Sequence, residues 1–463
     1  MMKNYDVAII GAGPAGLFAA DYILKNSNKA TVALIDKGKA VEARQCCDNC
    51  CICVEKDRCS VLCGVGGSGL FSDGKLVLNL HSGGTLDVVS VVTEKKRREL
   101  IETIVGTLRK YDGKSEHSLP ITEEQQKYWE ALCATQGLKI KHYDVLHMGT
   151  ANLHHITDRF VNKLRENQRI SVKLNCEIIK VTENINGQSV LQSLNGDALT
   201  ASYVIFSVGK TGSEWLKKLF GVNQIHLKKT NTYLGVRIET PNTALKELFR
   251  YSFDPKIWAY YGKRKVKTHC FCRRGDIVFT NYMGYQIVGG HTRFTKKNHV
   301  PVKEQSSKAN FNVLVSTSRN SGDVYGLLNK FLEINSKGAV VQKLLEFLDV
   351  PEKEYINNNS DTSRIGEGNI RKILDEFDST GKIISDFILR LSKIVPGILC
   401  EESKVYAPAL EWFMDSVEVD YNMETTHRGW FAVGDGAGLS QGIVHSAATS
   451  LIAAEEICRR IKN

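Results

Sequence analysis

The chain has 463 residues, of which 42% are hydrophobic and 24% are charged, so its composition is that of a soluble globular protein and wholesale disorder is excluded. The net charge of +10 comes from basic residues that are spread out, without the aromatic-studded basic stripe of a nucleic-acid binder. No apolar run has the length of a membrane span, and we expect a cytoplasmic protein of two or three domains. The sequence gives no prediction of the oligomeric state.

The first predicted feature is a nucleotide-binding turn. A buried strand at Tyr5–Ile10 runs into a G-x-G-x-x-G turn at residues 11–16, and an amphipathic helix follows. Such glycines permit the tight turn, the approach of a pyrophosphate and close helix–strand packing, while the helix N-terminus attracts phosphate. A second strand, Thr31–Ile35, ends at an acid about 20 residues further on, where an acceptor for a ribose hydroxyl belongs. The residues predicted to hold the ADP half of a dinucleotide are Gly11, Gly13, Ala15, Gly16 and Asp36.

A cluster of cysteines follows this unit. Seven of the 13 cysteines lie within residues 46–63, and three of them have the C-x-x-C-x-x-C spacing of iron–sulfur ligands. In a large cytosolic protein this predicts a metal site, with an iron–sulfur cluster favoured over zinc and with thiol–disulfide exchange as the alternative. The candidate ligands are Cys47, Cys50, Cys53, Cys59 and Cys63.

A second glycine-rich segment, Gly64–Lys75, is followed by an extended run at Leu76–Leu80 rather than by a helix. No acidic strand end follows at the required distance, so we predict a flexible loop that lies against the cofactor or substrate. The chain therefore lacks a dedicated NAD(P)H domain in this prediction.

The middle of the chain is predicted to form a second domain. Residues 90–140 have a helical period and are interpreted as a helical insertion, and the pattern changes to short strands after residue 215. Further predicted helices are Leu153–Glu166, Val324–Glu333 and Val340–Phe347, and predicted strands are Ile170–Leu174, Glu177–Glu183, Tyr203–Gly209, Tyr233–Glu239, Asp276–Thr280 and Tyr285–Gly289.

The C-terminal segment completes the nucleotide-binding pattern. A buried strand at Trp430–Val433 runs into Gly434–Gly438, and a helix follows at Gly442–Ile461. The two ends together indicate FAD. The predicted fold is α/β, with a Rossmann-like FAD/NAD(P)-binding domain at residues 1–215 and 401–463 and an inserted mixed α+β substrate domain at residues 216–400.

Several segments are familiar as a set: Gly66–Leu76, His147–Thr150, Ser207–Gly212, Gly235–Glu239, Cys270–Cys272 with Gly275, and Gly434–Gly442. The set resembles the hallmark motifs of a poorly characterised family of bacterial FAD-dependent dehydrogenases in the glutathione-reductase-like flavoprotein superfamily. The likeness spans nearly the whole chain. It implies FAD and two domains, and it names no substrate.

This resemblance, together with the chemistry of the residues, gives further cofactor contacts. The backbone at Ile178 would contact adenine, and the glycines Gly209 and Gly434 would admit the cofactor. Asp435 would accept a hydrogen bond from the ribityl chain, and Gly442 would direct a helix N-terminus at the flavin.

Five residues in these motifs are candidates for an acid, a base or an anion clamp: Lys75, His147, Arg237, His291 and His445. Arg237 is favoured as the clamp, because a guanidinium recognises a carboxylate or phosphate bidentately.

The leading prediction is an FAD-dependent oxidoreductase, a dehydrogenase or reductase, that acts on a small anionic metabolite. The cysteine loop would relay electrons to or from a protein carrier. Two alternatives stay open: a flavin-coupled thiol–disulfide oxidoreductase, and a non-enzymatic flavin-binding regulatory or RNA-associated protein.

Overall fold

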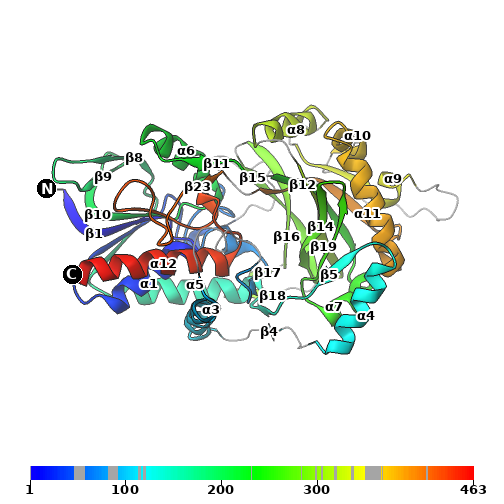
Figure 1. Cartoon of the computed structure of the whole chain (residues 1–463), viewed down its shortest axis with the longest axis horizontal. Helices are drawn as coiled ribbons and strands as arrows, with labels where there is room; N and C mark the ends of the chain where they lie inside the picture. The colour runs from blue at the N-terminus through cyan, green and yellow to red at the C-terminus, as the bar shows by residue number, and fades with distance from the viewer. Residues whose placement is uncertain are drawn as a thin grey trace.

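The computed structural model describes residues 2–45, 58–81, 92–112, 116–117, 121–230, 232–282, 284–292, 294–297, 300–303, 306–317, 321–334, 338–349, 366–367, 369–412 and 415–462. Two units lie side by side along the longest axis, each with its own sheet and hydrophobic core (Figure 1). Both chain ends lie at the outer end of the first unit.

The first unit is built on a seven-stranded sheet with the order β7-β2-β1-β10-β9-β8, in which β24 also pairs with β10. The strands are β1 (Lys3–Ile10), β2 (Val32–Ile35), β7 (Ile170–Lys173), β8 (Ile178–Glu183), β9 (Ser189–Ser193), β10 (Ala198–Phe206) and β24 (Trp430–Ala432). The pairs β7–β2, β2–β1, β1–β10 and β10–β24 are parallel, whereas β9 is antiparallel to both β10 and β8. Parallel strands buried on both faces need continuous apolar runs, as β1 and β2 have.

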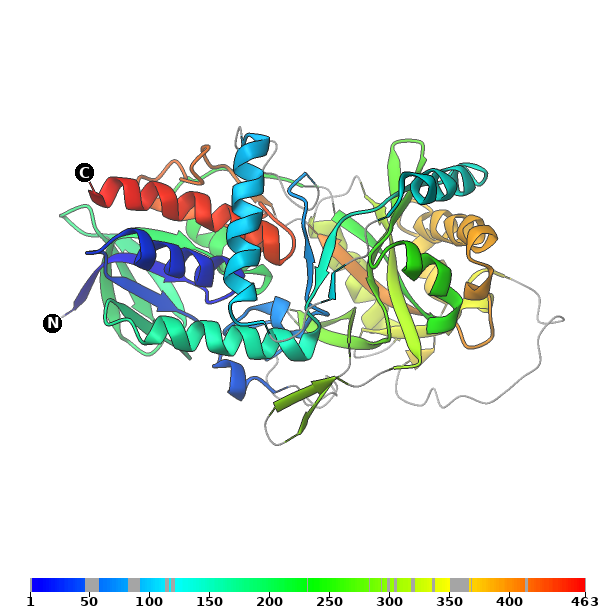
Figure 2. The ribbon, with the colours of Figure 1, turned by 90° about the horizontal axis from the view of Figure 1, so that it is seen from below.

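Helices cover this sheet. The helix α1 (Pro14–Asn26) lies between α12 (Ile443–Lys462) and α5 (Thr150–Arg165), with α3 (Glu94–Arg109) crossing them (Figure 2). The helix α6 (Ser213–Val222) packs through Phe220 against Phe206 of β10, ring edge to ring face. The order of strands and crossovers confirms the predicted Rossmann-like α/β fold.

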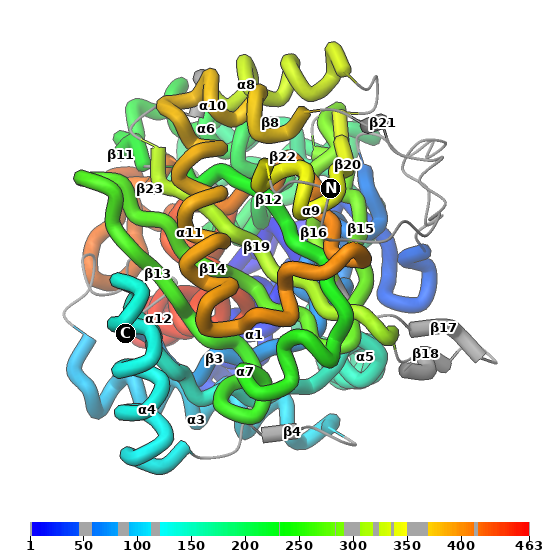
Figure 3. The backbone as a smooth tube through the Cα atoms, turned by 90° about the vertical axis from the view of Figure 1, so that its right-hand side faces the viewer, coloured from blue at the N-terminus to red at the C-terminus, as the bar shows by residue number. Residues whose placement is uncertain are grey.

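The second unit is an eight-stranded sheet with the order β21-β20-β22-β12-β19-β14-β13-β5. Its strands are β5 (Lys139–Lys141), β12 (Thr232–Pro241), β13 (Lys256–Tyr261), β14 (Arg264–Cys272), β19 (Lys308–Ser316), β20 (Val340–Lys343), β21 (Gly366–Glu367) and β22 (Lys404–Trp412). The helix α11 (Thr380–Ile394) runs across the face that points away from the first unit (Figure 3). Its buried apolar stripe forms the second core together with alternate residues of the strands.

The remaining helices of this unit are α4 (Glu123–Ala134), α7 (Lys246–Tyr251), α8 (Ser321–Ile334), α9 (Leu344–Phe347) and α10 (Ile370–Asp375). Smaller sheets are formed by β3 (Lys75–Val77), β6 (Val145–His147) and β4 (Glu116–His117), by β11 (Leu227–Lys228) and β23 (Ser416–Val417), by β15 (Gly275–Tyr282) and β16 (Tyr285–Thr292), and by β17 (Phe294–Lys297) and β18 (Val300–Lys303). Within the described residues, none of the helices has both the length and the apolar character that a membrane crossing requires.

One predicted helix is wrong. Residues 340–347 form the strand β20 followed by the single-turn helix α9. The β-branched Val340 and Val341 pair with Ala407 and Tyr406 of β22, and this pairing overrides the helical pattern.

Strand pairing also bears on the predicted domain limits. The helix α4 and the strand β5 come from the segment interpreted as a helical insertion of the first domain, yet Cys133 and Ile140 belong to the second core. The strand β22 lies beyond the predicted boundary at residue 400, and it pairs with β12 in the second sheet.

Candidate functional site

The parallel strands β2, β1, β10 and β24 all end at the same edge of the first sheet. Their carboxyl ends lead into the turn at residues 11–16, Asp36, the loop at residues 207–212 and the segment Gly434–Gly438. Ligands of open α/β sheets bind at this edge. The fold therefore brings the two ends of the sequence pattern to one place.

The glycine turn is too crowded for side chains. Gly11 has φ of +109°, and a Cβ there would lie 2.2 Å from the carbonyl oxygen of Ser207. A Cβ on Gly16 would lie 1.9 Å from the carbonyl oxygen of Gly11. The Ser207 hydroxyl donates to that same Gly11 oxygen at 2.8 Å, so the β1 and β10 loops are fixed together. The helix α1 starts directly behind, and its first-turn N–H groups are suited to bind phosphate.

Asp36 lies at the end of β2, as predicted. Its Oδ2 accepts the N–H of Ala12 and its Oδ1 accepts the N–H of Gly38, both at 2.7 Å. These bonds fix the acid against the glycine turn. Each carboxylate oxygen has a second lone pair, which a ribose hydroxyl could use.

The C-terminal motif is held by two hydroxyls. Ser440 and Ser446 both donate to Oδ1 of Asp435 at 2.8 Å, which leaves Oδ2 for a further donor. The N–H of Gly434 donates to the Thr449 hydroxyl at 3.1 Å, so the turn is bonded to α12. Gly442, with φ of +92°, precedes the first turn of that helix and is exposed.

Gly209 follows β10 at the same edge. It has φ of +63°, and a Cβ added to it would meet no atom within 4 Å. On its other side the backbone is closely packed, because a Cβ on Gly436 would lie 2.3 Å from the Gly209 oxygen. Ile178 begins β8, which is two strands away from β10 in the sheet.

The second glycine-rich segment packs onto the first. The N–H of Gly66 donates to the Ala12 oxygen at 2.8 Å, and a Cβ on Gly67 would lie 3.2 Å from Cα of Gly13. Leu70 is buried in the first core. The segment is therefore packed against the nucleotide turn, and its predicted position against the cofactor or substrate stays a prediction.

The buried side chain of Arg44, which the sequence analysis missed, organises this packing. Its guanidinium donates to five backbone carbonyl oxygens, those of Ser60, Val61, Gly64, Val65 and Gly67. Burial lowers the pKa of Arg44 to about 10, although Asp36 opposes the shift. The side chain stays charged at neutral pH, and its five hydrogen bonds hold the loop at residues 60–67 together.

Two of the five predicted metal ligands lie in this loop, at or next to the residues that Arg44 binds. Cys59 and Cys63 are buried, and the Cys63 thiol is 3.4 Å from the Thr211 hydroxyl. Burial raises the pKa of Cys63. Cys47, Cys50 and Cys53 lie outside the described residues. Within the part of the chain that is described, no three His, Cys, Asp or Glu side chains gather in a way that could hold a metal ion.

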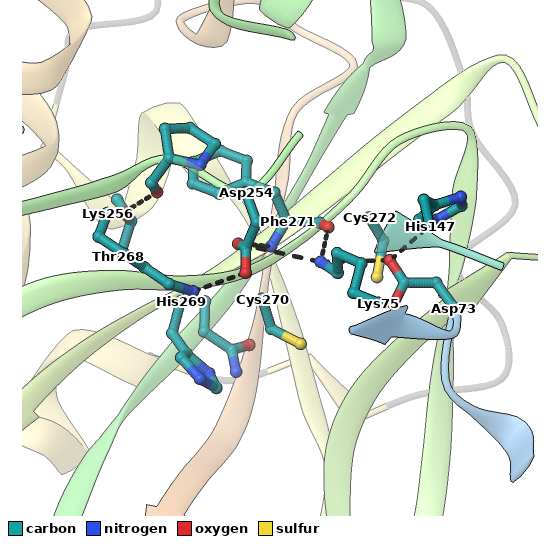
Figure 4. A network of polar contacts seen from close by, with 12 residues as sticks. Asp73, Lys75, His147, Asp254, Lys256, Thr268, His269, Cys270, Phe271 and Cys272 are labelled. Carbon is teal, nitrogen blue, oxygen red and sulfur yellow. Dashed lines mark hydrogen bonds and ion pairs between the residues drawn. The ribbon is translucent and has the colours of Figure 1, made fainter. Parts of the chain in front are cut away.

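A buried charged network joins the two units. The ammonium of Lys75 lies between Asp73 and Asp254 (Figure 4), with Nζ 3.2 Å from Asp73 Oδ2 and 3.9 Å from Asp254 Oδ1. It also donates to the carbonyl oxygen of Phe271 in β14. Burial alone would lower the pKa of Lys75, but the two carboxylates raise it above its ordinary value. Lys75 is therefore a permanent cation rather than a base.

Both carboxylates of this network have further partners. Oδ2 of Asp73 is 3.7 Å from Nε2 of His147. Asp254 pairs with Lys256 at 2.7 Å and accepts the N–H of Phe271 at 3.1 Å. Burial opposes ionisation, yet Lys75 and His147 lower the pKa of Asp73 to about 2. Likewise, Lys256 and Lys75 overcome burial and hold the pKa of Asp254 below its ordinary value.

The face of the second sheet that points toward the first unit carries further charges. Oε1 of Glu411 in β22 accepts from Lys267 at 2.9 Å, and its Oε2 lies 3.6 Å from Nδ1 of His269; both partners are in β14. Against the effect of burial, these two partners lower the pKa of Glu411 to about 2. Burial is the largest cause that holds the pKa of His269 below its ordinary value.

Arg237 does not fit the predicted role of anion clamp. Its side chain is 2% exposed, and it donates to Oδ1 of Asn310, Oδ1 of Asn312 and both the carbonyl oxygen of Cys270 and the sulfur of Cys272. A Cβ on Gly290 would lie 2.3 Å from Nη2, so backbone covers the guanidinium. Its donors hold the bulge of β14 at Cys270 instead of a ligand.

The other predicted catalytic residues are spread over the fold. Lys75 and His147 meet at Asp73, as described. His445 is buried in the first turn of α12. The backbone of His291 lies in β16 opposite Asp276, and its side chain is outside the described part of the chain.

Sequence reasoning missed most of the charged network. Asp73 lies two residues before Lys75 in the glycine-rich motif, and Lys265, Lys267 and His269 alternate along β14. The alternation is the signal that could have placed these three side chains on one face of a strand.

No protein-family model matches the chain, and no curated protein matches it. Solved structures do match, including glycine oxidase from Geobacillus kaustophilus at 13% identity and a TM-score of 0.42, over 99% of this chain and 95% of the other. L-alpha-glycerophosphate oxidase from Mycoplasma pneumoniae, solved with FAD bound, matches at 11% identity and a TM-score of 0.41, over 99% of this chain and 95% of the other. A flavoprotein/dehydrogenase from Cytophaga hutchinsonii matches at 10% identity and a TM-score of 0.41, over 99% of this chain and 79% of the other. TM-scores this low support no assignment of function. The fold assignment rests on the strand order of the two sheets.

Proposed function

We propose that the chain is an FAD-dependent oxidoreductase that acts on a small anionic metabolite. The observation that carries the proposal is the edge of the first sheet, where the glycine turn, Asp36, Gly209 and Asp435 gather from four separate strands. The family resemblance of the motifs supports the same cofactor. FAD, when bound, would supply the two-electron exchange with the substrate.

The residues at this edge fit the two halves of FAD. The turn at residues 11–16 and α1 suit the pyrophosphate, and Asp36 suits the adenosine ribose. Oδ2 of Asp435 suits a ribityl hydroxyl, and the N-terminus of α12 suits the flavin ring. A dinucleotide with two mononucleotide halves explains why both ends of the chain meet here.

The network around Lys75 suits the substrate side of the proposed reaction. Lys75 stays protonated at the junction of the two units, where the carboxylates of Asp73 and Asp254 balance its charge. His147, with 16% of its side chain exposed, is oriented by Asp73, and we infer that it is the acid or base for proton transfer.

The proposed electron relay concerns the cysteine loop. Cys59 and Cys63 lie in the loop that Arg44 holds against the nucleotide turn. An iron–sulfur cluster or zinc at residues 46–63 stays a prediction from the sequence, as does a protein electron carrier.

The cofactor assignment is tested by FAD affinity in variants of the site. Asp36→Ala and Asp435→Ala each remove a charged acceptor, and we expect each to weaken FAD binding at least about tenfold. Asp197→Ala, at an exposed turn between β9 and β10, removes the same charge and serves as the control. The affinity is measured by equilibrium dialysis, with circular dichroism as the check of folding. Unchanged FAD affinity in both site variants would refute the proposed site.

A further inference from the structure

One surface of the second sheet combines aromatic rings with lysines. Val266 of β14 and Ile257 and Ala259 of β13 point into the second core, so their strand neighbours point to the opposite face. There Lys265 is paired in register with Tyr260, and Lys267 with Trp258. We call the surface formed by Tyr233, Trp258, Tyr260, Lys265 and Lys267 the basic–aromatic face.

Contacts between these side chains show that they form one cluster. Nζ of Lys267 lies 4.1 Å from the centre of the Tyr233 ring, and Nζ of Lys265 lies 5.1 Å from that of Trp258. Burial, Glu411 and Tyr260 together raise the pKa of Tyr233 to about 12. Tyr260 is 58% exposed, so the cluster opens to solvent at that end.

Ammonium groups outnumber their carboxylate partners on this side of the sheet, because Lys139 and Lys141 of β5 also lie there, in register with Trp258 and Lys256. Lys267 is paired with Glu411 at 2.8 Å, and Lys256 of the same sheet is paired with Asp254 at 2.7 Å. Lys265 lies over the Trp258 ring, and no described carboxylate forms a salt bridge with it, although Glu411 acts on it from a longer distance. Burial and the neighbouring Lys267 hold the pKa of Lys265 below its ordinary value, and Glu411 opposes this shift.

The same face leads to the charged network of the candidate site. Lys265, Lys267 and His269 follow one another on alternate positions of β14, and the strand reaches Phe271, whose carbonyl oxygen accepts from Lys75. The face lies on the side of the sheet opposite α11, toward the first unit.

We propose that the basic–aromatic face binds a planar aromatic monocarboxylate, with its ring on the aromatic side chains and its carboxylate at Lys265. This inference rests on the proposed oxidoreductase function, because it names the class of substrate. The aromatic rings favour a flat ligand over an aliphatic one. The Lys265 ammonium beside Trp258 favours a negative charge on the ligand, and the nearby carboxylate of Glu411 disfavours a second one.

Calorimetric titration of the FAD-loaded protein with benzoate tests the proposal. Benzamide keeps the ring without the charge, and acetate keeps the charge without the ring. We expect saturable benzoate binding, with both analogues at least about tenfold weaker. Lys265→Ala should weaken benzoate binding about tenfold, and Lys265→Arg should largely restore it. Lys263→Ala removes the same charge from the exposed tip of the same hairpin and should leave the affinity unchanged.

The outcomes separate this inference from the oxidoreductase proposal. Equal benzoate affinity in Lys265→Ala and Lys263→Ala, equal affinity for acetate and benzoate, or no saturable benzoate binding would each overturn the inference. FAD content is measured in the same samples. Protein without FAD affinity that still binds benzoate through Lys265 would refute the oxidoreductase proposal and leave the anion site standing.

Discussion

The ammonium of Lys75 lies 3.2 Å from the carboxylate of Asp73, with 7% and 5% of the two side chains exposed. Removing one partner of such a pair leaves a buried charge without compensation. We therefore expect Lys75→Met to lower the free energy of unfolding by about 3–5 kcal/mol, as measured by urea denaturation.

An exposed ion pair provides the contrast. Lys25 pairs with Asp21 at 2.6 Å, with 51% of the lysine side chain exposed. Lys25→Ala should change the free energy of unfolding by less than about 1 kcal/mol. A loss of equal size in Lys75→Met and Lys25→Ala would contradict the buried network.

The pH dependence of stability follows from two buried carboxylates. The pKa of Asp73 falls from 3.8 to about 2, and that of Glu411 falls from 4.5 to about 2. A lowered folded-state pKa means that the unfolded chain binds more protons, so stability rises with pH in this window. The contribution of both groups is complete above about pH 5 and is lost as the pH falls toward 2.

Glu411→Gln isolates one of these groups. The free energy of unfolding of this variant, measured from pH 2 to 6, should change less steeply with pH than that of the wild-type protein. Parallel curves for the two proteins would contradict the lowered pKa of Glu411.

Arg44 gives a prediction about thiol reactivity. Lysine cannot replace a guanidinium that donates to five carbonyl oxygens, so Arg44→Lys should loosen residues 60–67 and expose Cys63. We expect alkylation of the tryptic segment 59–75 in the folded protein to accelerate at least about tenfold, as followed by mass spectrometry. Arg58→Ala, which removes an exposed ion pair with Glu177, is the control, and its cysteines are followed in the tryptic segment 57–75. Equal alkylation rates in Arg44→Lys and wild type would contradict the claim that Arg44 holds residues 60–67 together.

Two glycine substitutions separate local strain from helix propensity. Gly11→Ala places a Cβ 2.2 Å from the Ser207 oxygen at a φ of +109°, and it should cost about 3 kcal/mol or more. Gly106→Ala in α3 meets no atom within 4 Å, and it should stabilise the protein by about 0.5–1 kcal/mol. Thermal unfolding of the two variants tests the expected loss of stability in Gly11→Ala and the expected gain in Gly106→Ala. A Gly11→Ala variant as stable as the wild-type protein would contradict the close approach of the β1 and β10 loops.

The features that sequence reasoning predicted are those set by local physics. Gly11 and Gly16 are required by the geometry of one turn, and Asp36 follows its strand directly. The network was missed because its members are far apart in the chain, with Lys75 and Phe271 separated by 196 residues. Arg237 was misassigned for the same reason, since the acceptors that occupy it are on other strands.

Short apolar runs were the other source of error. Val340–Lys343 has too few residues for its period to separate a strand from a helix, and only pairing with β22 decides between them. By contrast, the prediction for α5 came within a few residues at each end, because this long helix has a regular apolar face.

The central claim is that the edge of the first sheet holds FAD. The most direct test is the visible absorption spectrum of the protein purified without oxygen, with the released nucleotide identified by chromatography and quantified per chain. The account predicts the flavin spectrum and one FAD per chain. Protein that contains no flavin and does not bind added FAD would contradict it.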